Sequence, residues 1–290
     1  MSHTHHSQSS TRIGWAFFLN VTFTVIEFVG GMLTNSTAIM ADAVHDLGDS
    51  LSIGFAWLLS RLSNKSANDN FSYGYQRFSL LGAFINGLVL IVGSIWVLSE
   101  AIPKLFKPEM PVVEGMLGLA ILGVAVNGFA AYKLSQGKTL NEKVLNWHLL
   151  EDVLGWVAVL IVSITLMFVE WPILDPALSI VFTLFILFNV GKNLWSSAKL
   201  FLQAVPDTDL SDKLYKILSS FDEVSDVHHL HLWSLDGEHH VLTAHLVIEQ
   251  MLEPVILSGL KQQIADQLNE FELAHTTIEF EFWDEKCRDS

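Results

Sequence analysis

Residues 36–60 read STAIMADAVHDLGDSLSIGFAWLLS, a mostly apolar run interrupted by four ionisable side chains. An α-helix needs about 20 predominantly apolar residues to cross the hydrocarbon core of a bilayer, and this run is long enough. His45 and Asp49 are four residues apart, so both side chains lie on one helix face. Ionisable groups at membrane depth are costly and mark candidate functional sites. The run therefore predicts a transmembrane helix with a polar site on one face.

Further apolar segments of similar length lie on both sides of this one. The predicted spans are residues 13–33, 36–60, 78–102, 112–134, 144–169 and 173–201. Lys and Arg gather at the N-terminus, in the second and fourth loops and at the end of the sixth span, and cytoplasmic loops carry such an excess. We therefore expect an all-α six-helix transmembrane bundle in residues 13–205, with both termini in the cytoplasm. Residues 1–12 are polar, contain His3, His5 and His6, and are expected to form a disordered arm.

The C-terminal residues, 206–290, have a different composition. They carry 18 acidic and 5 basic side chains, against 13 and 11 in residues 1–205. Such an acidic segment excludes a nucleic-acid partner, because phosphate binding needs clustered Lys and Arg. The predicted elements are a helix at 207–221, strands at 224–235 and 239–249, a helix at 254–271 and a strand at 276–283. This αββαβ order predicts a cytoplasmic α+β, ferredoxin-like domain with its helices on one sheet face.

Two histidines fall within the predicted membrane spans, and each precedes an aspartate by four residues. The pairs are His45 with Asp49 and His148 with Asp152. On two facing helices they would supply two imidazoles and two carboxylates, a tetrahedral set that suits Zn²⁺ and accepts Co²⁺ or Cd²⁺. We predict these four residues to be the ligands of an intramembrane metal site. Asp42 shares their helix face and could line the ion path.

Two other functions are compatible with metal ligands in a membrane. An intramembrane metallohydrolase needs an open coordination position and often an H-E-x-x-H string, which is absent here, so no enzymatic activity is expected. A membrane metal sensor would suit the acidic, His-containing tail. A sensor, however, has no need for ligands at bilayer depth. The pattern therefore favours transport.

Three short motifs accompany this order of elements. They are HDLGD at 45–49, FSYGYQR at 71–77 and HLLED at 148–152. With these motifs, the chain resembles, over about residues 12–283, the bacterial zinc-exporting branch of the cation diffusion facilitator family. The resemblance implies a homodimer in the bacterial inner membrane that exports cytoplasmic Zn²⁺ in exchange for protons by alternating access. Cd²⁺, Co²⁺ and Fe²⁺ are alternative cargoes.

The resemblance also bears on the junction between membrane and cytoplasm. Some relatives hold a further metal ion in the loop after the second helix, but the matching positions here are Asn68, Phe71 and Tyr75. We therefore expect this loop site to be absent. Arg77 and Asp207 match positions that form an interlocking charge pair in relatives. By that resemblance they would hold the hinge of the dimer.

In the tail, the resemblance implies His228, His245 and Glu281 as ligands of a regulatory cytoplasmic Zn²⁺, which makes residues 206–290 a metal-binding and dimerisation domain. Strand alternation agrees only in part. It places His245 and Glu281 on the solvent face but favours His231 over His228, so His231 is an alternative ligand. Cys287 is the only cysteine, which excludes intrachain disulfides and Cys-rich zinc modules.

Overall fold

The computed structural model describes residues 3–59, 62, 65–135 and 140–289; the side chains of residues 1–17, 19, 56–57, 133–134 and 140–148 are outside the described part. The chain folds into two compact units. One contains residues 1–61 and 81–194, and the other contains residues 62–80 and 195–290. Each unit is described by itself.

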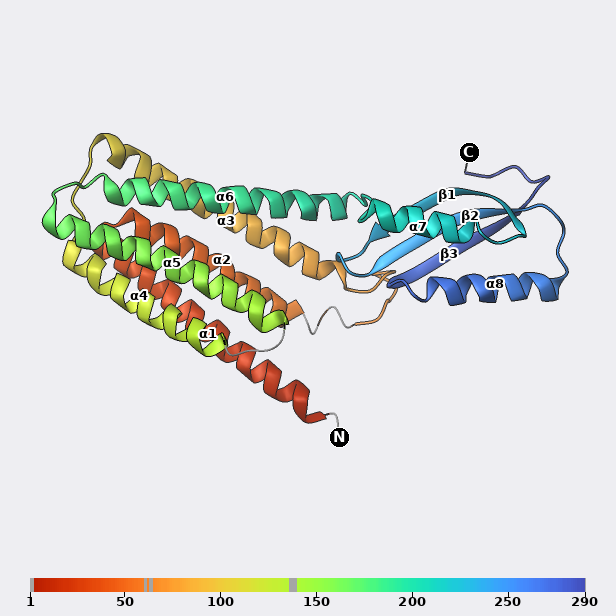
Figure 1. Ribbon diagram of the computed structural model, residues 1–290, viewed down its shortest axis with the longest axis horizontal. Helices are drawn as coiled ribbons and strands as arrows, with labels where there is room; N and C mark the ends of the chain where they lie inside the picture. Colours follow the sequence, from red (N-terminus) through yellow and green to blue (C-terminus); the bar gives the residue numbers. More distant parts are fainter. Residues whose placement is uncertain (1–2, 60–61, 63–64, 136–139, 290) are drawn as a thin grey trace. The chain divides into compact units, whose positions relative to one another are not determined.

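Long helices build the first unit (Figure 1). They are α1 (His3–Thr34), α2 (Thr37–Leu59), α3 (Arg77–Phe106), α4 (Val113–Leu134), α5 (Leu140–Phe168) and α6 (Leu174–Phe201). Within the described residues, four stretches are long and apolar enough to cross a membrane: Arg77–Phe106, Val113–Tyr132, Leu149–Phe168 and Leu174–Phe201. α1 adds the shorter apolar stretch Asn20–Thr34, and α2 carries three carboxylates among its apolar residues.

The first helix begins earlier than the apolar pattern predicts. α1 starts at His3 and so includes residues 3–12, which the sequence analysis assigned to a disordered arm. These residues contain neither Pro nor Gly. Extending an existing helix costs far less than starting one, so polar residues without a helix breaker can continue the first turn of a long helix.

Helix α2 is buried on two sides by apolar contacts. Ala38 and Ile39 pack in a core with residues of α4 and α5, while Ala41 and Val44 pack in a second core with residues of α3 and α6. All four side chains are at most 3% exposed. Because interiors pack as densely as organic crystals, these contacts hold the orientation of α2, and with it the face that carries His45.

Asp175, near the start of α6, accepts hydrogen bonds from the N-terminus of α2. Its carboxylate accepts hydrogen bonds from the Thr37 backbone N–H (2.7 Å), the Thr37 hydroxyl (2.8 Å) and the Ser36 hydroxyl (2.5 Å). The side chain is 1% exposed. A carboxylate at a helix N-terminus satisfies unpaired backbone donors and interacts favourably with the helix dipole. The contact therefore links α2 to α6 at one end of the bundle.

The second unit contains the predicted αββαβ order, and each element lies within three residues of its expected limits. The elements are α7 (Thr208–Leu218), β1 (Val224–Ser234), β2 (His240–Ile248), α8 (Pro254–Leu268) and β3 (Leu273–Phe282). The sheet order is β1-β2-β3, with β1 antiparallel and β3 parallel to β2. Gly237 closes the β1–β2 hairpin with φ 108°, a conformation that favours glycine.

One face of this sheet carries the core of the second unit. Leu242, Leu246 and Ile248 of β2 pack there with Leu214 of α7 and Ile264 of α8. Both helices therefore cover the same face, as the alternation of the strands predicts. The residues between these positions point to the opposite face, which we call the open face because α7 and α8 both pack on the core side. This open face is the histidine-rich side of the sheet.

Candidate metal sites

In the first unit, side chains from α2 and α5 converge on one point. His45 Nε2 lies 3.7 Å from Asp49 Oδ2 on its own helix and 3.7 Å from Asp152 Oδ1 on α5. One donor atom from each residue lies within 4.8 Å of the other two. The i and i+4 spacing aligns the first pair on α2, and the packing of α2 against α5 adds the third donor. Three of the four predicted intramembrane ligands therefore meet.

The fourth predicted ligand is His148, whose side chain lies outside the described residues. Its backbone belongs to α5, four residues before Asp152. This spacing places both positions on the same face of α5. His148 therefore stays a predicted ligand, on the helix face that the structure turns toward His45.

A cavity of about 460 Å³ opens beside these donors. His45, Asp49 and Asp152 line it, together with Asp42 and Glu151. Its polar lining also includes Ser52 of α2, Asn86 of α3, and Asn189 and Asn193 of α6. Sequence spacing places Glu151 on another face of α5, and only the packing of the helices shows that it reaches this space.

The cavity extends from the three donors toward the end of the bundle at which α2 leads into α3. There, Asn86 Nδ2 donates a hydrogen bond to Ser52 Oγ over 2.8 Å, and both residues line the cavity. Amide and hydroxyl groups can replace part of the hydration shell of a cation before it reaches charged ligands. The arrangement is a polar approach to the carboxylates and the imidazole.

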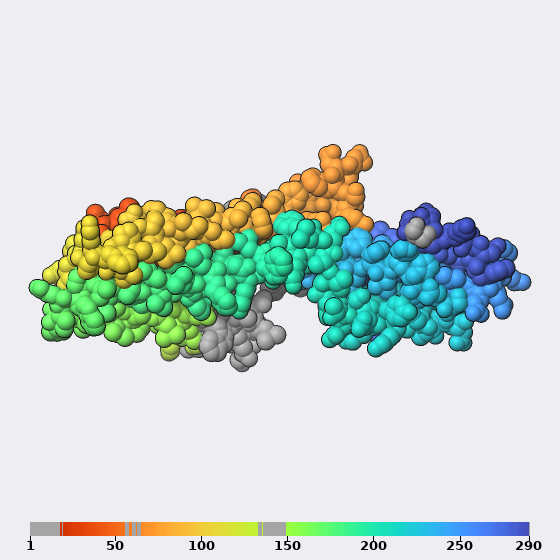
Figure 2. Space-filling model, turned by 90° about the horizontal axis from the view of Figure 1, so that it is seen from above, coloured from red at the N-terminus to blue at the C-terminus, as the bar shows by residue number. Residues whose placement is uncertain are grey.

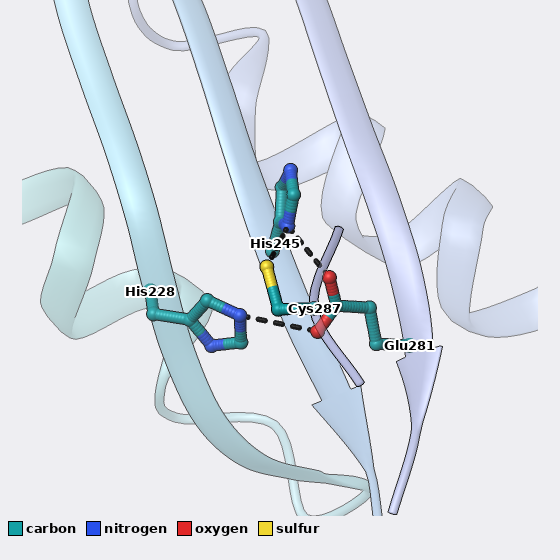
Figure 3. Close-up of side chains that lie close together, drawn as sticks. All are labelled: His228, His245, Glu281 and Cys287. Atoms are coloured by element: carbon teal, nitrogen blue, oxygen red, sulfur yellow. Dashed lines mark hydrogen bonds and ion pairs between the residues drawn. The ribbon is translucent and has the colours of Figure 1, made fainter. Parts of the chain in front are cut away.

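In the second unit, a further group of donors gathers on the open face of the sheet (Figure 3). It consists of His228 on β1, His245 on β2, Glu281 on β3, and Cys287 beyond the end of β3. His245 Nδ1 lies 2.7 Å from Glu281 Oε1 and 3.5 Å from Cys287 Sγ. His228 Nε2 lies 3.1 Å from Glu281 Oε2. The four donors lie within 4.8 Å of one another.

A bulge in β1 decides which histidine joins this group. The register of β1 against β2 shifts between His228 and His231, and His229 in the bulge has a φ of 47°. The extra residue reverses the alternation, so His228 lies opposite His245 on the open face. His231 is exposed and lies outside the group that the described side chains form.

Cys287 is the functional candidate that the sequence pattern missed. A single cysteine excludes intrachain disulfides. Its position in the sequence does not distinguish Cys287 from an ordinary exposed residue near the C-terminus. One signal was available, since Cys287 follows Glu281 by only six residues. A short return of the chain after β3 can therefore bring its thiol back to the strand that carries Glu281.

The pKa values of Glu281 and Cys287 shift in opposite directions. Burial alone would raise the pKa of Glu281, but hydrogen bonds from Cys287 and His245, with the nearby imidazoles, hold it below its ordinary value. Burial raises the pKa of Cys287, and the neighbouring Glu281 carboxylate adds to that effect. A bound divalent cation would offset the negative charge that Glu281 concentrates there.

The junction positions make other contacts. Asn68 Nδ2 donates to Tyr75 Oη over 2.9 Å, and the Phe71 and Tyr75 rings lie 4.6 Å apart. Asp207 caps α7 by accepting a hydrogen bond from the Asp209 N–H, and no ion pair joins it to Arg77 among the described residues. The proposed charge pair between Arg77 and Asp207 stays a prediction.

Comparisons with known proteins match two consecutive segments of the chain. The family model described as the cation efflux transmembrane domain matches residues 15–202, and the one described as the cation efflux protein, cytoplasmic domain, matches residues 206–282. The chain is 31% identical to the "Cadmium, cobalt and zinc/H(+)-K(+) antiporter" of Bacillus subtilis, covering 97% of this chain and 92% of that protein.

Two further relatives are similar over nearly their whole length. The "Metal cation efflux system protein CzcD" of Cupriavidus metallidurans is 33% identical, with 97% of this chain and 89% of the relative covered. The "Zinc transporter ZitB" of Pectobacterium atrosepticum is 32% identical, with 100% and 91% covered. Matches to both family models, at these positions and over this length, show that the chain belongs to the cation efflux family.

Proposed function

We propose that the protein exports divalent transition-metal ions, chiefly Zn²⁺, from the cytoplasm in exchange for protons. The observation that carries the proposal is the meeting of His45 and Asp49 on α2 with Asp152 on α5, beside a polar cavity. Charged ligands at membrane depth are costly and are kept where an ion passes. Membership of the cation efflux family supports the same reading.

The donor set favours zinc among the candidate cargoes. With His148 as the fourth ligand, two imidazoles and two carboxylates would surround the ion in the tetrahedral geometry that Zn²⁺ prefers. Cd²⁺, Co²⁺ and Fe²⁺ accept similar ligands, so they are secondary cargoes in the proposal. The names of the relatives from Bacillus subtilis and Pectobacterium atrosepticum include zinc, and the former also includes cadmium and cobalt.

Proton exchange follows from the chemistry of the ligands. Zn²⁺ binds neutral imidazole and ionised carboxylate, so metal loading releases protons that these groups hold in its absence. Histidine changes its charge near neutral pH, and reprotonation of His45 and His148 on the far side would expel the ion. Alternating access lets the same ligands meet the cytoplasm and the far side in turn.

We further propose that α1–α6 all cross a bacterial inner membrane, with the two termini in the cytoplasm. α1 and α2 are long enough to span it, and the excess of Lys and Arg in the second and fourth loops supports this orientation. The αββαβ domain would be ferredoxin-like and would form a homodimer. Its family model covers residues 206–282.

In this proposal His228, His245 and Glu281 bind a regulatory cytoplasmic Zn²⁺. Their donor atoms already lie within reach of one ion. Zinc would stabilise the dimer state to which it binds more tightly. Arg77 and Asp207 would pair at the hinge in at least one state of the transport cycle.

Flux measurements in proteoliposomes test the transport proposal. Asp49→Ala and Asp152→Ala are each expected to abolish Zn²⁺-driven proton movement, because each removes a ligand and leaves the ion incompletely coordinated. Asp69→Asn is the matched control, since this carboxylate lies in an exposed turn and does not line the cavity. Wild-type flux in both alanine variants would exclude the assignment of the site.

A further inference from the structure

The last residues of the chain turn back over the open face of the sheet. We call residues 284–289 the C-terminal strap. Glu285 anchors it to the end of β3, since the Phe282 N–H donates to Glu285 Oε2 and the Glu285 N–H donates to the Phe282 carbonyl, both over 2.9 Å. Arg288 Nη2 donates to Glu279 Oε2 over 2.7 Å. In Figure 2 the C-terminal residues, in dark blue, lie at the surface of their unit.

These anchors place the one thiol of the chain among three other metal donors. Figure 3 shows Cys287 Sγ beside the imidazole of His245 and the carboxylate of Glu281. His245 and Glu281 are 7% and 6% exposed. His228 Nε2 is buried and makes no hydrogen bond, although it lies 3.1 Å from Glu281 Oε2. His228 Nδ1 lies 3.1 Å from Asp226 Oδ2, and a proton on Nδ1 would leave the Nε2 lone pair for a cation.

We propose that Cys287 is the fourth ligand of a tetrahedral His₂-Glu-Cys site, which the C-terminal strap closes and which selects thiolate-binding ions such as Zn²⁺ and Cd²⁺. The proposal rests on the cytoplasmic metal site proposed above and specifies its coordination. Thiolate ligands favour Zn²⁺ and Cd²⁺, whereas Mn²⁺ and Mg²⁺ prefer all-oxygen sites. Four protein ligands leave no open position, as is usual for a structural zinc site.

The distances fit such a site with small movements. Zn–S bonds of about 2.3 Å and Zn–N or Zn–O bonds of about 2.0–2.2 Å separate tetrahedral ligand atoms by about 3.3–3.8 Å. His245 Nδ1 and Cys287 Sγ are 3.5 Å apart, inside that range. His245 Nδ1 and Glu281 Oε1 are 2.7 Å apart, so the carboxylate would move outward by less than about 1 Å.

The surroundings of His245 can accommodate the tautomer that metal binding requires. Its Nε2 faces two carboxylates, Glu279 Oε2 at 3.8 Å and Asp289 Oδ2 at 3.6 Å. These distances are too long for direct hydrogen bonds, but both negative charges would stabilise a proton on Nε2 once an ion occupies Nδ1. In this structure His245 Nδ1 donates to Glu281 Oε1 over 2.7 Å, so metal binding would move the proton to Nε2 and free the Nδ1 lone pair for the ion. Outer carboxylates of this kind orient the ligating histidines of metal sites.

Cobalt spectroscopy on the full-length protein tests this proposal. Co²⁺ bound by a thiolate gives a charge-transfer band in the near ultraviolet, and Cys287 is the only cysteine that can produce it. One equivalent of Co²⁺ at the cytoplasmic site is expected to give the band in the wild type. Cys287→Ser and His245→Ala are expected to abolish it. The double variant Asp49→Asn with Asp152→Asn should retain it, because those carboxylates belong to the membrane site.

Competition between ions provides a second measurement. Loss of the thiolate is expected to weaken Cd²⁺ binding at this site at least tenfold in Cys287→Ser and to leave Mn²⁺ binding within about twofold. Absence of the band in folded, Co²⁺-loaded wild type would overturn the proposal, and so would a band unchanged in His245→Ala. Neither result bears on export, which the proteoliposome flux of the Asp49 and Asp152 variants decides separately.

Discussion

His228 lies directly opposite His245 across the antiparallel β1–β2 pair. The pairing exists because His229 occupies a bulge with positive φ, which reverses the alternation of β1 between Val227 and Leu230. Val227 faces the core and is 6% exposed, so His228 points to the open face. The bulge thereby adds an imidazole from β1 to donors on β2 and β3.

His229→Val is expected to disfavour the bulge, because a β-branched residue rarely adopts positive φ, and regular alternation from Leu230 would then turn His228 toward the core. The cytoplasmic site would then lose one ligand, and Co²⁺ affinity there should fall at least tenfold. His229→Gly is the matched control, because glycine adopts positive φ without the penalty of about 1–2 kcal/mol that other residues incur. Titration of the thiolate band measures both variants. Equal affinities in His229→Val and the wild type would contradict this account of the bulge.

Replacing one imidazole of the membrane site with a carboxylate should change the choice of ion. His45→Asp makes the donor set richer in oxygen, which suits Mn²⁺ better than Zn²⁺. We expect the ratio of Zn²⁺ flux to Mn²⁺ flux to fall about tenfold, equivalent to about 1.4 kcal/mol of differential binding. Parallel flux assays with the two ions in proteoliposomes measure the ratio. An unchanged ratio would show that His45 does not contribute to selectivity.

Asp175→Asn should weaken the link between α6 and α2. The variant loses the negative charge that accepts hydrogen bonds from Thr37 and Ser36 at the N-terminus of α2. Hydrogen bonds to charged groups contribute about 1.5–3 kcal/mol each, so the thermal midpoint of the detergent-solubilised protein should fall by several degrees. Glu170→Gln, at an exposed site in the preceding turn, serves as the control and should leave the midpoint in place.

A methyl group at Gly123 should disrupt the contact of α4 with α5. A Cβ built there would lie 2.1 Å from the indole of Trp156, a side chain that is 1% exposed. Overpacking of this kind costs about 1–3 kcal/mol, and Gly123→Ala should lower the thermal midpoint accordingly. At Gly128 on the same helix, a Cβ meets no atom within 4 Å. Gly128→Ala should therefore be neutral or slightly stabilising, and a similar loss in both variants would refute the packing argument.

Much of the architecture can be predicted from local sequence patterns. The apolar runs indicate each long helix in order, and the alternation in the tail indicates three strands between helices, because both patterns depend on neighbours within a few residues. The start of α1 at His3 shows the limit of this reasoning. Polar residues that include neither Pro nor Gly do not indicate where such a helix begins.

The spacing of His45 with Asp49 and of His148 with Asp152 was sufficient to identify two helix faces as metal-binding, since helical geometry makes residues i and i+4 neighbours. Only the tertiary structure decided which groups meet. The approach of Asp152 to His45 depends on the packing of α5 against α2, and the choice of His228 depends on one positive φ angle. Cys287 reaches Glu281 because the strap folds back over the sheet. Contacts of this kind are set by packing between segments, and no local pattern in the sequence records them.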